Sequence, residues 1–121
     1  MSWFAAHAVM YLKLKEETQD DFLVWENVLL VEASSPSEAE TKATALARDE
    51  EGDSQGTLTH GGKPATWVFA GLRKMISVSH RGADGELTSG DEATYSEYRV
   101  ADLPSVMKLA AGEAVDVRYV E

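Results

Sequence analysis

The strongest constraint on the fold is a strict alternation of apolar residues near the start of the chain, over residues 3–15. Every second position in this segment is apolar, and these positions form one face: Phe4, Ala6, Ala8, Met10, Leu12 and Leu14. The positions between them form an amphipathic face: Trp3, Ala5, His7, Val9, Tyr11 and Lys13. A period of two is typical of a β-strand, so the alternation predicts a long strand with one apolar face.

A second strand is predicted over residues 22–33, after a polar turn. This segment is rich in β-branched and aromatic residues, and Glu26 and Asn27 interrupt its apolar character near the middle. Since both of its faces are largely apolar, we expect a central strand that is covered on both sides. The short turn favours antiparallel pairing with the first strand.

The clearest local signal is the start of a helix at Ser35. Ser35 is a good N-cap, Pro36 suits the first helical position, and Glu38 stands where a capping box requires an acid. The positions that follow make a narrow stripe of small residues at helical spacing: Ala39, Ala43, Leu46 and Ala47. Such a stripe indicates close packing of the helix on a sheet, with Gly52 ending the helix.

A hairpin is predicted next, with Gly61 and Gly62 supplying the positive φ angles of a two-residue turn. A long strand then follows over about residues 65–79. Gly71 lies inside it, and a glycine inside a strand often marks a bulge, which would swap the faces of all later residues.

The rest of the chain predicts a polar loop, a strand, a short helix and a closing strand. Asp102 is the expected N-cap of the short helix, and Gly112 is its expected C-terminal stop. We therefore expect one α+β domain over residues 1–121. Its fold would be an antiparallel β-sheet of about five to six strands, with one main helix and one short helix packed on one face.

The sheet face away from the helices is expected to be aromatic. If the strands keep their alternation, it carries Trp3, His7, Tyr11, Trp67 and Phe69. Two thin helices cannot cover both faces of a large sheet, and an uncovered aromatic face usually meets another chain or a ligand. We therefore predict a protein interface that includes Trp3, His7, Tyr11 and Phe69.

One stretch of the chain resembles a known family. The run "VWENVLLVEASSPSEAETKA" joins an acid-bearing strand, a Ser-Pro cap and an EAxxKA helix, and "GKPATWVFAG" adds a glycine-bearing turn followed by W-x-F. This succession, over roughly residues 3–79, resembles the small bacterial proteins of domain of unknown function 4288. The resemblance implies a self-standing bacterial α+β domain, and it brings no established activity or catalytic residue with it.

The charge of the chain argues against several partners. Acidic residues outnumber basic ones by 21 to 11, which gives a net charge of −10. This charge repels phosphate backbones and anionic lipid, so we expect neither nucleic acid nor a membrane as a partner. Cysteine is absent, which removes thiolate catalysis and cysteine-bound metal centres. The N-terminal apolar run has no basic segment before it and reaches Lys13 too early to span a bilayer, so a cytoplasmic protein is expected.

Motifs for catalysis or for a cofactor are not found. The three histidines, His7, His60 and His80, form no H-x-H or H-x₃-H pair, so structural or surface roles are favoured over metal binding. Nucleotide-binding glycine loops and a G-x-S-x-G turn are absent from the sequence. We predict no catalytic residue, no metal and no cofactor.

The best polar set lies within predicted strands: Glu26, Arg73, Lys74, Glu97 and Arg99. The favoured interpretation is structural, with Arg73 paired across strands to Glu26 or Glu97 and the Lys74 stem lying along apolar surface. The functional alternative is a patch that binds an anion or a carboxylate. In that patch Arg73 would be the fork, and the walls would be Trp67, Trp25 and Tyr95.

Three functions follow from these observations. The first is a non-enzymatic interaction module that acts as a homodimer through its uncovered sheet face. The second is an acidic protein, of the immunity or inhibitor kind, that binds a basic protein partner. The third is a small-ligand-binding protein or enzyme that uses Arg73 with Glu26 or Glu97.

Overall fold

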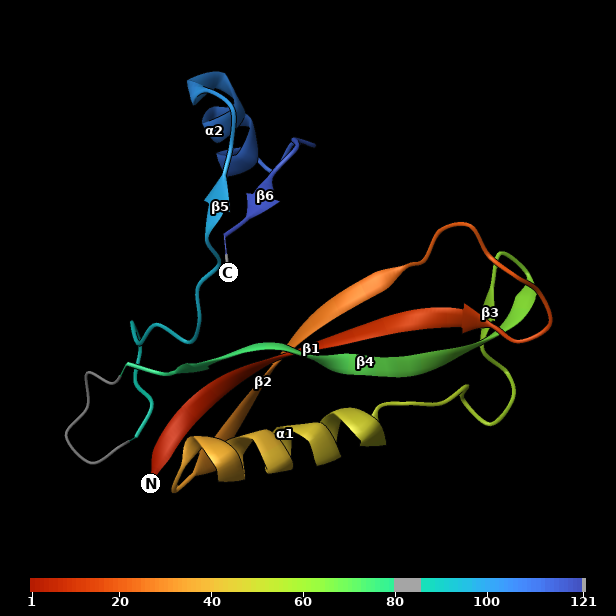
Figure 1. Ribbon diagram of the computed structural model, residues 1–121, viewed down its shortest axis with the longest axis horizontal. Helices are drawn as coiled ribbons and strands as arrows, with labels where there is room; N and C mark the ends of the chain where they lie inside the picture. Colours follow the sequence, from red (N-terminus) through yellow and green to blue (C-terminus); the bar gives the residue numbers. More distant parts are fainter. Residues whose placement is uncertain (80–85, 121) are drawn as a thin grey trace.

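A curled antiparallel sheet and one helix form the main body of the molecule, and a smaller unit follows at the C-terminus (Figure 1). The computed structural model describes residues 1–79 and 86–120, so His80 and the first part of the predicted loop lie outside the described residues. The elements of the main body are β1 (Ser2–Leu14), β2 (Val24–Ala33), α1 (Pro36–Asp49), β3 (Thr59–His60) and β4 (Lys63–Ser77). Those of the C-terminal unit are β5 (Tyr98–Arg99), α2 (Leu103–Ala110) and β6 (Arg118–Tyr119).

The sheet of the main body has the strand order β2-β1-β4-β3, and every neighbouring pair is antiparallel. The central position of residues 22–33 was predicted wrongly, because β2 lies at the edge and β1 lies in the centre. The central position was predicted because β2 is apolar on both faces, which is typical of a central strand. Here Val24 and Leu30, on the face away from α1, stay 51% and 42% exposed.

Helix α1 covers one face of the sheet, and it begins as the sequence predicts. The Ser35 hydroxyl accepts a hydrogen bond from the Glu38 N–H at 3.1 Å, and Pro36 takes the first turn. The carboxylate of Glu38 binds the Ser34 hydroxyl and Lys42. Three alanines of the predicted stripe are fully buried against the sheet: Ala39, Ala43 and Ala47. They let the helix approach the apolar face of β1 closely, which is where the core lies.

Two bulges in β4 decide which side chains reach which face. The tight turn at Gly61 and Gly62 (φ 60° and 81°) leads into β4 as predicted. The pairing of β4 with β1 then shifts twice, between His7 and Ala8 and between Val9 and Met10. The first shift leaves Arg73 as an extra residue in β4, and the second leaves Ala70 as another. Gly71, with φ 153°, lies between them, as expected for a bulge position.

The register of β4 against β1 corrects the predicted aromatic face. Trp67 pairs with Leu12 and Phe69 pairs with Met10, and both aromatic rings pack in the core on the side of α1. The expectation that they share a face with Trp3, His7 and Tyr11 is therefore wrong. Trp67 and Phe69 come before both inserted residues, so the cause is the register itself, which sets the odd-numbered residues of this part of β4 opposite the even-numbered residues of β1.

The C-terminal unit confirms the α+β class but not the predicted place of the second helix. Asp102 caps α2 by accepting from the Ser105 N–H at 2.9 Å, and Gly112 follows the helix with φ 78°. The unit lies on the other side of the sheet from α1, rather than beside it (Figure 1). The cause is the preceding segment, because residues 94–95 bind the sheet face opposite α1. The two strands predicted on either side of α2 shorten to β5 and β6.

Among the described helices, neither α1 nor α2 is long and apolar enough to cross a membrane.

Candidate functional site

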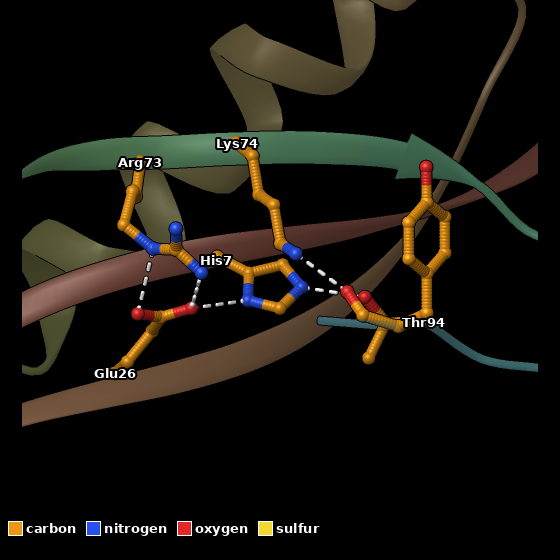
Figure 2. Close-up of polar contacts among 6 residues, drawn as sticks. His7, Glu26, Arg73, Lys74 and Thr94 are labelled. Carbon is orange, nitrogen blue, oxygen red and sulfur yellow. Dashed lines mark hydrogen bonds and ion pairs between the residues drawn. The ribbon is translucent and has the colours of Figure 1, made fainter. Parts of the chain in front are cut away.

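A cluster of polar side chains occupies the middle of the sheet face opposite α1, and we call it the His7 cluster. Figure 2 shows its members, contributed by β1, β2, β4 and the segment before β5: His7, Glu26, Arg73, Lys74 and Thr94. Arg73 and Lys74 leave β4 on the same side of the sheet, although neighbours on a regular strand alternate. The bulge at Arg73 makes this possible, since it adds one residue without advancing the pairing.

The carboxylate of Glu26 receives both arms of the Arg73 guanidinium. Arg73 Nε donates to Oε1 and a terminal nitrogen donates to Oε2, each at 2.8 Å. The pair is about three-quarters buried, with the side chains 22% and 26% exposed. The hydrogen bonds from Arg73, with help from His7, hold the pKa of Glu26 below its ordinary value of 4.5. Glu26 is therefore an anion at neutral pH, and Arg73 already has its carboxylate.

His7 lies at the centre of the cluster and is 2% exposed. Its Nδ1 lies 2.6 Å from Glu26 Oε2, and its Nε2 lies 2.5 Å from Thr94 Oγ1. An ionised carboxylate only accepts, so Nδ1 donates to Glu26. In the neutral ring Nε2 then accepts from the Thr94 hydroxyl. Both ring nitrogens are thus satisfied, which a buried imidazole requires.

The order hydroxyl–imidazole–carboxylate is also the order of a proton relay in hydrolases. In this molecule the carboxylate is held by a bidentate guanidinium, and the imidazole is closed off from solvent. These two features favour a structural role. The cluster fastens the segment that carries Thr94 onto the sheet, and it keeps a buried histidine hydrogen-bonded while doing so.

The two adjacent cations hold the C-terminal segment in different ways. Lys74 Nζ donates to the backbone oxygen of Tyr95 and lies 5.3 Å from the centre of the Tyr95 ring. The Arg73 guanidinium carbon lies 4.5 Å from the centre of the Tyr119 ring. Both are cation–π contacts. Arg73 and Lys74 together therefore bind the chain on both sides of α2 to the sheet.

The model of a family described as "Domain of unknown function (DUF4288)" matches residues 3–92, which is more than half of the chain. The chain belongs to this family. A search of the curated proteins and a search of the solved structures gave no significant match to this chain.

The DUF4288 match divides the His7 cluster. Its members on the sheet lie within residues 3–92, whereas Thr94 and Tyr95 come just after them. The matched region supplies the histidine, the carboxylate and both cations. The segment that they fasten belongs to the part of this chain beyond the match.

The other predicted ligand-binding residues of this DUF4288 domain are spread over both faces. Trp67 lies on the α1 face and contacts Trp25, with ring centres 4.7 Å apart. Glu97 follows the fastened segment, and its backbone oxygen accepts from the Val120 N–H at 3.1 Å. Of the predicted set, the structure brings together Glu26 and Arg73, with Tyr95 beside Lys74. Trp67 forms no wall of that cluster.

The predicted interface residues are similarly divided. Trp3 and Tyr11 lie on the face opposite α1 and are half-buried, and Tyr11 contacts Phe22 with ring centres 5.7 Å apart. His7 lies between them but is covered, while Phe69 is in the core. Sequence reasoning missed Thr94, because a threonine in a polar segment gives no signal of its partner. Within residues 1–79 and 86–120, no group of three metal-ligating side chains is found.

Proposed function

We propose that this DUF4288 domain is a non-enzymatic interaction module that acts as a homodimer. The observation that carries the proposal is a row of exposed apolar side chains at and just before the edge strand β2. Each is between 42% and 52% exposed: Phe22, Leu23, Val24, Trp25, Val28 and Leu30. Their side chains lie on both faces of the strand, Trp25 on the α1 face and Val24, Val28 and Leu30 on the other, so together they line the edge. Scattered apolar residues on a surface are ordinary, but such a concentration along one edge is typical of a surface that another protein covers.

The row replaces the aromatic face as the basis of the proposal. It belongs to one edge of the sheet, whereas the middle of the face opposite α1 is already occupied by the His7 cluster and the segment that it fastens. A dimer built on the row would include Glu26, whose carboxylate already binds Arg73 and His7. Since cyclic dimers use the same patch on both subunits, a self-complementary apolar row suits this symmetry.

The small-ligand alternative has less support. An anion-binding arginine needs its donors directed at a cavity, whereas Arg73 directs Nε and a terminal nitrogen at Glu26. A ligand carboxylate would have to displace an internal one that is held by two charge-assisted hydrogen bonds.

The homodimer is tested by light scattering on a size-exclusion column, at protein concentrations from about 1 to 100 μM, a span that covers typical weak to moderate affinities. We expect twice the mass of a single chain at the upper end. Leu30→Lys should lower the dimer fraction, because it places a cation in the apolar row. Met107→Lys is the matched control, since Met107 is 62% exposed but lies on α2. A single-chain mass at every concentration contradicts the proposal.

A further inference from the structure

The two edges of the main sheet are protected to different degrees. The β4 edge carries two bulges, its Phe69 N–H is bound by the Glu51 carboxylate at 2.9 Å, and Trp67 bridges to Gly52. Bulges and covering loops are the usual means by which proteins block pairing at an edge. At the outer edge of β2, no strand pairs in the described part of the chain. β2 is ten residues long and contains neither proline nor lysine.

The backbone groups that point outward from β2 follow from its pairing with β1. The Leu12 N–H donates to the Leu23 oxygen at 3.0 Å, and these residues continue the register of the two strands. In an antiparallel ladder the residues that bond to the neighbour alternate with those that do not. The odd-numbered residues of β2 therefore bond to β1. The even-numbered residues direct their N–H and C=O outward: Val24, Glu26, Val28, Leu30 and Glu32.

One end of this edge is already occupied. Lys42 Nζ, from α1, donates to the Glu32 oxygen at 2.8 Å. The usable outward groups are then those of the four residues before it: Val24, Glu26, Val28 and Leu30. Their centre is Asn27, and a two-fold axis through Asn27 would use all four in each copy.

We infer that the homodimer forms by antiparallel pairing of β2 with β2 of a second copy, in a register centred on Asn27. The inference rests on the proposed function and names its surface. Val24 lies opposite Leu30 of the partner, and Glu26 lies opposite Val28. The apolar row thus meets itself, and each carboxylate faces an aliphatic side chain. The result is one continuous antiparallel sheet through both copies.

The neighbouring registers of a β2–β2 pair are less favourable. A register centred on Glu26 sets this carboxylate against its own copy, and one centred on Leu29 sets Glu26 against Glu32. Like charges directly opposite each other destabilise a sheet. A register centred on Val28 requires the Glu32 backbone oxygen, which Lys42 already binds.

A shallow groove at the end of β2 fits the same register. It has a volume of about 500 Å³, and Leu30, Val31 and Leu46 contribute to its largely apolar lining. In the register centred on Asn27, Leu23 of the partner lies opposite Val31, on the side of α1. Leu23 is 43% exposed in the single chain. The second copy would therefore fill the groove with its own apolar residue.

Cysteine cross-linking tests the register directly, because the natural chain contains no cysteine. Asn27 of each copy would be a non-hydrogen-bonded pair, with Cα atoms about 4.5 Å apart. This separation suits a disulfide. Under mild oxidation we expect Asn27→Cys to run mainly as a cross-linked dimer on a non-reducing gel. Val28→Cys and Leu29→Cys, which belong to the two later registers, should remain mostly single chains.

A second variant tests the edge without relying on oxidation. Val28→Pro removes an outward N–H, and proline is tolerated in edge strands where the N–H faces solvent. The variant should keep its circular dichroism spectrum and lose the dimer at concentrations where the natural chain is dimeric. Circular dichroism of the variant also shows whether any loss of dimer comes from unfolding. In that event Val28→Lys replaces it, with the same expected loss of dimer.

The outcomes separate this inference from the proposed function. A natural chain that is monomeric throughout overturns both. A dimer that survives Val28→Pro or Val28→Lys overturns the β2 pairing and leaves the homodimer standing. Cross-linking of Val28→Cys or Leu29→Cys in preference to Asn27→Cys overturns the register centred on Asn27 in the same way. An edge that captures an unrelated extended peptide while the natural chain stays monomeric also overturns the pairing.

Discussion

The main body and the C-terminal unit differ in how each is stabilised internally. The main body buries a continuous set of apolar side chains between its sheet and α1, and three alanines of α1 are completely inaccessible. Helix α2 has no buried residue, and its apolar side chains Leu103 and Met107 are 69% and 62% exposed. The same chain therefore contains one region stabilised by burial and another with little burial of its own.

The contacts between the two regions are polar and aromatic. Among the described residues they include the His7–Thr94 hydrogen bond, the contact of Lys74 with Tyr95 and the contact of Arg73 with the Tyr119 ring. The His7 cluster thus does for the C-terminal segment what apolar burial does for α1. The boundary of the DUF4288 match, at residue 92, falls close to this change in the type of contact.

The largest expected difference between the regions comes from the same substitution made in each. Met10 is 2% exposed and packs with Ala47 and Phe69, whereas Met107 on α2 is 62% exposed. Met10→Ala should lower the free energy of unfolding by about 2–5 kcal/mol, because it leaves a cavity in the core. Met107→Ala should change it by less than about 0.5 kcal/mol. Urea unfolding followed by circular dichroism measures both, and equal losses would contradict the contrast.

A smaller change in the free energy of unfolding is expected from the His7 cluster, which connects the two regions. Glu26→Gln removes the carboxylate that binds both Arg73 and His7, and it should cost about 1–3 kcal/mol in unfolding free energy. The matched control is Glu17→Gln. Glu17 pairs with Lys63 at 2.6 Å, but both side chains are about half exposed. This surface pair should contribute no more than about 1 kcal/mol.

The same variant carries a pH dependence with a definite sign. The pKa of Glu26 is lower in the folded chain than its ordinary value of 4.5. Its contribution to stability is therefore complete above about pH 4.5, and it is lost as the pH falls through the lowered pKa. The stability difference between the natural chain and Glu26→Gln should shrink in acid. A difference that stays constant from pH 7 to about pH 3 would show that charge is not involved.

The two helix caps should give the smallest effects, and they should differ in kind. Ser35→Ala removes the cap of α1, and it should lower the unfolding free energy of the main body by about 1 kcal/mol. Asp102→Ala removes the cap of α2, which packs little against the main body. We expect fraying of α2, visible as faster amide hydrogen exchange in residues 103–110, without a change in the urea midpoint of the main body. A shifted midpoint would mean that α2 folds cooperatively with the sheet.

Local signals predicted much of this fold. The alternation in β1, the Ser35 and Asp102 caps, the Gly61–Gly62 turn and the bulge near Gly71 all depend on residues close in sequence. Strand order was harder, because β2 is apolar on both faces at an edge. Composition alone does not distinguish a central strand from an edge strand that is apolar on both faces.

The site was predictable only in part. The sequence predicted Glu26 or Glu97 as the acceptor for Arg73, and in the structure the acceptor is Glu26. The covering of His7 by Thr94 joins residues 87 positions apart. No periodicity or motif reports a contact between a strand and an irregular segment at that distance. The faces of Trp67 and Phe69 were predicted wrongly for a related reason, because they depend on the register of β4 against β1, which pairs residues far apart in the sequence.

The two bulges also make β4 unusual in how it would tolerate changes in length. From Ala65 to Ser77 the strand advances twelve residues, while its partner advances ten, from Leu14 to Phe4. Deleting Ala70 would therefore straighten the ladder at one point and keep the flanking pairs in place, whereas deleting Arg73 would also remove the guanidinium that binds Glu26. Deletion of Leu72 would instead pull a core side chain out of position. Natural length variation of this strand within the family should accordingly fall at the position of Ala70, where the strand carries one residue more than its partner and no charged contact is lost.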